Sequence, residues 1–334
     1  PGCDPIYMVY DKKNRLMMSQ DGNQRAENPN KWSYSLYDNQ NRSVESGEIV
    51  LSQAITHLNL QSEISTRENY IPTGTKTALQ YTLYDTYEAT AKVPVHSFQA
   101  IPGYSTSNYT RTTGLVTSIK TKVLNMTPEV WLTTTTYYDD HGRVIQTVSN
   151  NIQGGISRVN LKYNFRGKVI QQKESHKIGN NTDELETIYE YDKRERLLAT
   201  TTKLNEGQPA KVTYIYDKLG RLVSQKYGTI TETVSYNPRG WLTSKESQLF
   251  KMKLNYDSPA SGAKSCYNGN ISEWEWQYGT DTVFMYSFAY DMLNRLKEST
   301  EKIKSGNSWI NLKHNHVERS ITYDLNGNIS KLSR

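Results

Sequence analysis

The fold of this chain is decided by the stretch Tyr214-Ile215-Tyr216-Asp217-Lys218-Leu219-Gly220-Arg221-Leu222, because close relatives of it recur along most of the 334 residues. The motif is an aromatic strand ending in Tyr-Asp or Tyr-Asn, two free positions, Gly or Asn, usually Arg, and an apolar residue that starts the next strand. Its Tyr stands at Tyr10, Tyr37, Tyr138, Tyr163, Tyr191, Tyr216, Tyr236, Tyr256, Tyr290 and Tyr323. A chain that repeats itself in this way is read as a repeat array.

The residue types of the motif predict a β-hairpin turn. A three-residue hairpin loop is commonly a type I turn followed by one residue in the left-handed region, which forms a bulge. Asp or Asn suits the first turn position because its side chain accepts a hydrogen bond from the backbone N–H two residues on. The left-handed position favours Gly, with Asn as the next least strained choice. That position holds Asn14, Asn41, Gly142, Gly167, Glu195, Gly220, Gly240, Asn294 and Gly327, and only Glu195 departs from the rule.

Four copies carry the complete motif, and we expect their residues to have a structural role. The Tyr is predicted on the core face of the sheet, the Asp in the turn, and the Arg paired with the Asp of a neighbouring copy or covering aromatic rings. These residues are Tyr10, Asp11, Asn14 and Arg15; Tyr138, Asp139, Gly142 and Arg143; Tyr216, Asp217, Gly220 and Arg221; and Tyr290, Asp291, Asn294 and Arg295.

The strands before the turns have a sided pattern. The residue two places before the repeat Tyr shares its face of the strand. It is apolar or aromatic in most copies, and the set is Met8, Leu161, Tyr189, Tyr214, Val234, Leu254, Phe288 and Ile321, with Ser35 and Thr136 as exceptions. We predict that this face is buried and that the alternate face, which mixes apolar and polar residues, is partly wet.

The composition favours a half-buried sheet. The mean hydropathy is −0.75 and hydrophobic residues make up 35% of the chain, yet 25 Tyr stand against 5 Phe. Tyr and Thr favour strands with one wet face, so the low hydropathy indicates amphipathic sheet and not disorder.

Charge and cysteine content exclude several classes of function. The net charge of +6 is spread along the chain, whereas a nucleic-acid binder clusters its basic residues on one face or in one run. Cys3 and Cys266 are too few and too far apart in sequence to define a disulfide framework or a zinc site. No stretch approaches the apolar run of about 20 residues that a membrane helix needs. We therefore expect no nucleic-acid partner and no membrane span.

The repeats divide the chain into three parts of one repeat architecture. Residues 1–50 carry two copies, and residues 51–135 are an irregular β insertion with a degenerate copy at Tyr84-Asp85. Residues 136–334 are the regular array, in which successive Tyr spacings of 20 to 28 residues between Tyr138 and Tyr256 fit one hairpin per copy. One short helix is expected at 52–60, capped by Ser52. Because the sequence begins without Met and stops just after a turn, we expect a fragment truncated at both ends.

The Tyr-Asp-x-x-Gly-Arg-Leu units resemble the YD repeats of the Rhs family, which includes shell subunits of insecticidal toxin complexes and the animal teneurins. The stretches 10–25 and 114–143 look most like Rhs-type proteins of the Bacteroidetes. The resemblance implies a sheet of hairpins that spirals into a shell around a C-terminal cargo domain of the same parent chain, often a toxin. Many members carry a self-cleaving core with a Pro…Asp-Pro-x-Gly signature, which this sequence lacks.

Candidate chemical sites in the sequence are weak. His314-x-His316 puts two imidazoles on one side of a strand without a third ligand nearby. The stretch 273–276, Glu-Trp-Glu-Trp, puts two carboxylates on one face and two indoles on the other, whereas a glycosidase needs carboxylates set across a sugar. Trp274 and Trp276 remain a candidate ligand platform. We predict no catalytic residue, no cofactor and no metal site.

The sequence therefore favours a non-enzymatic structural segment of an Rhs-type shell. The alternative is a surface adhesin or glycan-binding protein that uses exposed Tyr and Trp side chains, and a weaker one is a carbohydrate-active enzyme. The expected partners are the C-terminal cargo domain, with secretion machinery or cell-surface glycans as further candidates. The expected location of the parent protein is secreted or at the surface of a bacterial cell.

Overall fold

The computed structural model describes residues 4–312 and 318–333. Within them the regular structure consists of antiparallel strands and two short helices, α1 (Gly22–Ala26) and α2 (His57–Ile64). The prediction of an all-β array of antiparallel hairpins is confirmed. The chain divides into two units, the first made of residues 1–188 and 203–208 and the second of residues 189–202 and 209–334.

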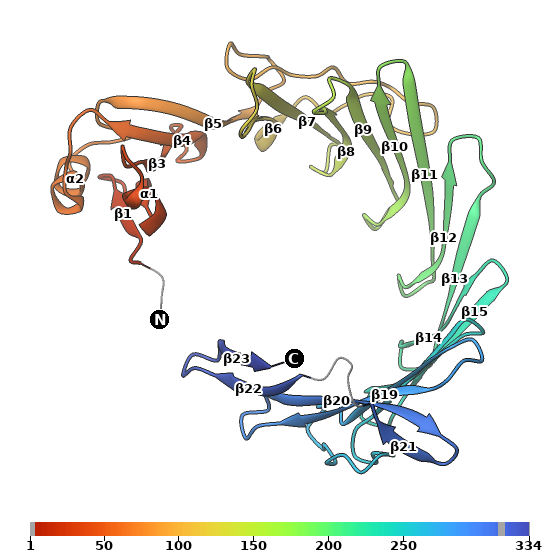
Figure 1. Ribbon diagram of the computed structural model, residues 1–334. Coiled ribbons are helices and arrows are strands. Elements are labelled where there is room, and N and C mark those ends of the chain that lie inside the picture. The colour runs from red at the N-terminus through yellow and green to blue at the C-terminus, as the bar shows by residue number, and fades with distance from the viewer. Residues whose placement is uncertain (1–3, 313–317, 334) are drawn as a thin grey trace. The chain divides into compact units, whose positions relative to one another are not determined.

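In the first unit, each strand pairs in antiparallel register with the next strand along the chain, as the row from β7 to β10 shows (Figure 1). The strands that begin there are β1 (Tyr7–Tyr10), β2 (Leu16–Gln20), β3 (Trp32–Tyr37), β4 (Ser43–Leu51), β5 (Gly74–Asp85), β6 (Thr112–Val123), β7 (Val130–Tyr138), β8 (Val144–Asn150), β9 (Ile156–Tyr163), β10 (Val169–Ile178) and β11 (Asn181–Tyr191). Sequential pairing of this kind needs only short turns, which the motif supplies.

The second unit continues the same pattern of sequential antiparallel pairs. Its strands are β12 (Leu197–Leu204), β13 (Ala210–Tyr216), β14 (Leu222–Tyr227), β15 (Ile230–Tyr236), β16 (Leu242–Glu246), β17 (Phe250–Asn255), β18 (Glu273–Tyr278), β19 (Phe284–Tyr290), β20 (Leu296–Ser305) and β21 (Ser308–Asn311). A separate hairpin is formed by β22 (Arg319–Tyr323) and β23 (Ile329–Ser333).

In the first copy of the motif, the buried face is the one opposite to the face that the sequence predicts. Met8 is 43% exposed, whereas its neighbour Val9 is fully buried. The cause is α2, whose Leu60 and Ile64 are also fully buried and join Val9 in one apolar cluster with Met17, Met18, Trp32, Tyr34, Ile49 and Ile71. The prediction was wrong here because strand alternation says which residues share a face, but not which face another segment covers.

The irregular segment 86–111 covers β-structure in the same unit. Tyr87 stacks on Tyr137 with ring centroids 4.6 Å apart, and Phe98 meets Tyr137 edge-on at 5.3 Å. Tyr137 is consequently buried, although it lies on the face that the sequence predicts to be partly wet. In the second unit the predicted face is the better buried one, as Val234 and Ile321 are buried while Ile215 is exposed.

Both helices differ from the expectation of one helix at 52–60. The expected helix begins later, at His57, and its N-cap is Thr56, whose side chain accepts from Asn59 N–H at 3.4 Å. The unexpected α1 begins with a capping box in which Asp21 and Gln24 bond each other's backbone N–H. That signal, Asp followed three residues later by Gln, was present in the sequence. Among the described residues, neither helix has the length and apolar character that a membrane crossing requires.

Candidate functional site

The repeat turn has the predicted geometry at Gly220. The N–H of Gly220 donates to the carbonyl of Asp217 at 3.1 Å, which closes the type I turn, and Asp217 N–H donates to Arg221 O at 2.9 Å. Gly220 is left-handed, with φ +86°, and the strand register shifts between Ile215 and Tyr216. One oxygen of the Asp217 carboxylate accepts from the N–H groups of Leu219 and Arg221, both at 2.9 Å. The Asp217 side chain thus stabilises the turn by accepting hydrogen bonds from two of its backbone N–H groups.

The same turn recurs wherever the motif is complete. The left-handed residues and their φ angles are Asn14 (58°), Asn41 (64°), Gly142 (72°), Gly167 (83°), Glu195 (63°), Gly240 (82°), Asn294 (62°) and Gly327 (85°). Glu195 therefore adopts the common turn even though its residue type does not favour it, and its N–H donates to Asp192 O as in the other copies.

The repeat Arg pairs with the Asp of its own copy. Arg221 Nε lies 2.7 Å from the Asp217 carboxylate, and the Arg143–Asp139 and Arg295–Asp291 pairs have the same separation. The turn reverses the chain between the two residues and so brings them together. The expected pairing with a neighbouring copy is found at Arg42, which bonds its own Asp38 and also Asp85 of the next, degenerate copy.

Each Arg also covers the Tyr ring of the following copy. The guanidinium carbon of Arg221 lies 4.8 Å from the ring centre of Tyr236. Equivalent pairs are Arg15–Tyr37, Arg42–Tyr84, Arg143–Tyr163, Arg196–Tyr216 and Arg295–Tyr323. Such cation–π contacts contribute roughly 0.5 to 1 kcal/mol each at exposed sites.

In eight copies the Tyr hydroxyl ties its hairpin to the one before it. Tyr216 Oη donates to Leu197 O at 2.9 Å, and Leu197 directly follows the Arg that covers the Tyr216 ring. The same bond is made by Tyr37, Tyr84, Tyr138, Tyr163, Tyr256, Tyr290 and Tyr323 to Leu16, Ser43, Val116, Val144, Leu242, Ile271 and Leu296, respectively. We call this arrangement of Asp, Arg, the next Tyr and its carbonyl acceptor the repeat clamp.

The repeat clamp also sets the charge state of its carboxylates. Burial acts to raise the pKa of Asp11, but hydrogen bonds from the Arg15 side chain and from the N–H groups of Arg15, Asn69 and Lys13 outweigh it and lower the pKa to about 2. At Asp217 the backbone N–H of Arg221 is the main cause of a lowered pKa. These carboxylates are therefore anions at neutral pH that serve as acceptors for the turn.

We expect Gly220→Val to destabilise its hairpin by about 1 kcal/mol or more and Gly220→Asn to cost much less. A β-branched residue is strained at positive φ, whereas Asn tolerates it. A Cβ at this position would meet only Arg196 Nη1, at 3.8 Å, so the cost is conformational and not a clash. Urea unfolding midpoints of the two variants measure the difference. Equal midpoints would show that the position does not demand the left-handed conformation.

Trp274 and Trp276, the predicted platform, lie side by side on β18 with ring centroids 5.0 Å apart. Tyr286 of β19 lies 5.1 Å from Trp276, nearly parallel to it. Glu273 and Glu275, which alternate with the two Trp residues along β18, lie on the other face, where Glu273 is fully buried. The Glu273 carboxylate accepts from Ala260 N, Ser261 N, Ser261 Oγ and Asn255 Nδ2 at 2.6 to 3.1 Å. These hydrogen bonds fix Ala260 and Ser261, which belong to the segment that follows the broken copy at Tyr256.

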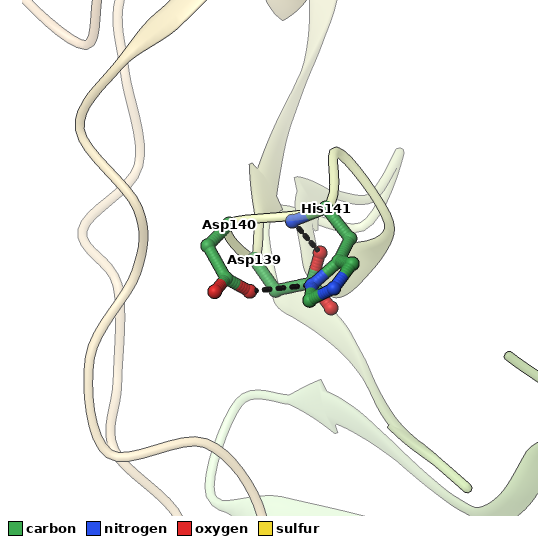
Figure 2. Close-up of side chains that lie close together, drawn as sticks. All are labelled: Asp139, Asp140 and His141. Atoms are coloured by element: carbon green, nitrogen blue, oxygen red, sulfur yellow. Dashed lines mark hydrogen bonds and ion pairs between the residues drawn. The ribbon is translucent and has the colours of Figure 1, made fainter. Parts of the chain in front are cut away.

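A cluster that the sequence analysis did not single out is formed by Asp139, Asp140 and His141, whose ligand atoms lie within 4.8 Å of one another (Figure 2). His141 Nδ1 is 2.7 Å from an Asp140 oxygen. One Asp139 oxygen accepts from the N–H groups of His141 and Arg143, and the other pairs with the Arg143 side chain. The repeat turn accounts for this proximity. His314 and His316 lie outside the described residues.

No protein-family model matches this chain, and no curated protein matches it. Among solved structures, the chain is similar to the Photorhabdus luminescens Tc holotoxin pore, with 11% identity over 98% of this chain and 18% of that one and a TM-score of 0.36. It is also similar to TcdB2-TccC3 without its hypervariable C-terminal region, with 14% identity over 97% of this chain and 16% of that one and a TM-score of 0.38. The chain spans less than a fifth of the length of these chains. The likeness is one of fold alone.

Proposed function

We propose that this chain is a non-enzymatic structural segment of an Rhs-type β-shell, which encloses a C-terminal effector domain of the same parent chain and helps to deliver it. The observation that carries the proposal is the repeat clamp. At Asp217 and its equivalents the Asp carboxylate is engaged by the turn and the Arg, and the hydroxyls of Tyr216 and seven equivalent Tyr residues are engaged by the preceding hairpin. The polar groups that recur most often along the chain are therefore used to hold hairpins together.

An array of hairpins joined in this way can form the wall of a shell around another domain. Each clamp joins only neighbouring hairpins, so stability adds up along the array in the manner of repeat proteins, and further copies extend the wall without a new core. The proposal places the paired strands as wall, including β5 and β6 of the segment 51–135, and the irregular segment 86–111 as an insertion that covers part of it. It also places the parent protein outside the cytoplasm or on the bacterial surface, with the effector domain as its partner.

Limited proteolysis of the full-length parent chain tests the proposal. The effector domain should resist a protease within the parent chain and be cut readily when it is made alone, because a closed wall excludes the protease. The matched control is the parent chain with Arg196→Ala and Tyr216→Ala, which removes one clamp and should restore cutting. A parent chain without any further domain, or one whose C-terminal domain is cut at the same rate in both forms, would contradict the proposal.

A further inference from the structure

Five aromatic side chains form one continuous surface on β18 and β19, on the face of the sheet that carries the repeat Tyr. They are Trp274, Trp276, Phe284, Tyr286 and Phe288, and we call them the aromatic surface. Neighbouring ring centroids are 5.0 to 6.2 Å apart. The strand register places Trp274 opposite Tyr286 and Trp276 opposite Phe284. All five side chains are half-buried, so part of each remains accessible.

Within residues 4–312 and 318–333, two buried polar atoms at the aromatic surface have no hydrogen-bond partner. They are Nε1 of Trp274 and one carboxylate oxygen of Glu301. Glu301 is only 7% exposed, and it lies directly opposite Tyr286 on β20, hence on the same face. The three residues therefore form a row across three strands. A buried polar group without a partner costs about 1 to 3 kcal/mol, and more when it is charged, so such a group needs an explanation.

The opposite face holds the aromatic surface in place. Glu273 and Met285, which alternate with the aromatic residues along β18 and β19, are fully buried. Glu273 is fixed by its bonds to Ala260 and Ser261, and Lys302 Nζ donates to Ser261 Oγ at 2.6 Å. A surface whose supporting layer is packed and hydrogen-bonded binds without first having to order itself.

The indole N–H of Trp274 and the carboxylate of Glu301 together favour one class of ligand. Indole N–H only donates and a carboxylate only accepts, whereas a hydroxyl does both. A cationic ligand would pair with Glu301 but leave the indole N–H of Trp274 unpaired, and an apolar ligand would satisfy neither group. A sugar ring offers hydroxyls on its rim and an apolar C–H face that packs flat on aromatic rings.

We propose that Trp274, Trp276, Tyr286 and Glu301 form a binding site for a neutral saccharide. A pyranose ring stacks on the half-buried rings of Trp276 and Tyr286. Its hydroxyls donate to Glu301 and accept from Trp274. This binding role goes beyond the structural role of the repeat clamp and does not depend on it, because saccharide binding and effector protection have separate readouts.

The test titrates the chain with cellohexaose, mannohexaose and chitohexaose, followed by tryptophan fluorescence and calorimetry. At least one should bind saturably. We expect Trp276→Ala, which removes a stacking ring, and the isosteric Glu301→Gln, which removes a charged hydrogen bond, each to weaken that binding about tenfold or more. Trp309→Ala is the matched control and should bind normally, because Trp309 lies opposite Lys304, which alternates with the residues of the site along β20.

Three results would overturn the proposal. The first is that none of the three saccharides binds at millimolar concentration. The second is that the fluorescence change survives in Glu301→Gln, whose shape and volume keep the fold intact and whose thermal midpoint confirms it. The third is that a lysine-rich peptide binds and the saccharides do not, which would assign Glu301 to a cationic partner instead.

Discussion

Glu273→Ala is expected to lower the free energy of unfolding by about 3 kcal/mol or more, the largest effect of any single substitution that we predict. The carboxylate is fully buried and accepts four hydrogen bonds, so its removal leaves the donors of Ala260 and Ser261 without this acceptor and takes one of two acceptors from Asn255 Nδ2. Each buried donor that loses its acceptor costs about 1 to 3 kcal/mol, and several are lost here together. Urea unfolding and hydrogen exchange of residues 257–265 measure the loss.

Glu275→Ala is the matched control for this substitution. Glu275 lies two residues further along the same face of β18, is less buried than Glu273, and accepts one hydrogen bond, from Asn255 Nδ2 at 2.8 Å. It should cost about 1 kcal/mol, the usual net value of one hydrogen bond. A Glu273→Ala variant no less stable than Glu275→Ala would show that the buried carboxylate does not anchor the segment.

Glu273 also predicts a pH dependence. Burial acts to raise the pKa of its carboxyl group, but the bonds from Ser261, Ala260 and Asn255 outweigh it and leave the pKa below its ordinary value of 4.5. A carboxyl group with a lowered pKa in the folded state contributes stability that is present above its unfolded pKa and lost as the pH falls through the folded one. Glu273→Gln should therefore weaken the loss of stability on acidification below about pH 4.5.

The hairpin array could be predicted from the sequence because its cause is local. Type I turn, left-handed residue and strand alternation are all set by residues within the motif, and Asn14, Gly142 and Gly220 adopt the predicted conformation. The Arg–Asp pairing within one copy also had a sequence signal. Where the first turn residue is Asn, as at Asn164 and Asn237, the Arg position holds Lys168 or Trp241 instead.

The covered face could not be predicted, because it depends on segments outside the motif. Val9 is buried and Met8 is exposed because α2 packs on the side of the strand that carries Val9. The repeat motif contains no residue that predicts where α2 packs. The three donors that Ala260 and Ser261 supply to Glu273 follow from the path of the chain after the broken copy at Tyr256, which has no motif either.

Glu301 is different, since its position could have been found. The turn after Tyr290 pairs Tyr290 with Leu296, and counting back through the bulge sets Glu301 opposite Tyr286. The acidic member of the proposed saccharide site was therefore implied by the repeat turn itself.

The second large effect is expected at Asp11. Asp11→Asn should destabilise the chain by about 2 kcal/mol at neutral pH, because the folded pKa of about 2 lies below the ordinary value of 3.8 and each pKa unit corresponds to about 1.4 kcal/mol. The Asp11 side chain is fully buried and pairs with Arg15, which is itself 9% exposed. An amide in its place leaves the guanidinium of Arg15 without its counter-charge.

The sign of the pH effect separates this electrostatic contribution from a loss of packing. The stability that Asp11 contributes is fully present above about pH 4 and is lost as the pH falls toward 2, so the difference between wild type and Asp11→Asn should shrink over that range. Asp217→Asn is the matched control in the same turn position, with a side chain that is 21% exposed and less able to strengthen its ion pair. It should cost less than Asp11→Asn at pH 7. The two variants could instead lose the same stability, with neither loss depending on pH between 4 and 2. That result would show that the negative charge of the Asp makes no contribution to the stability of the turn.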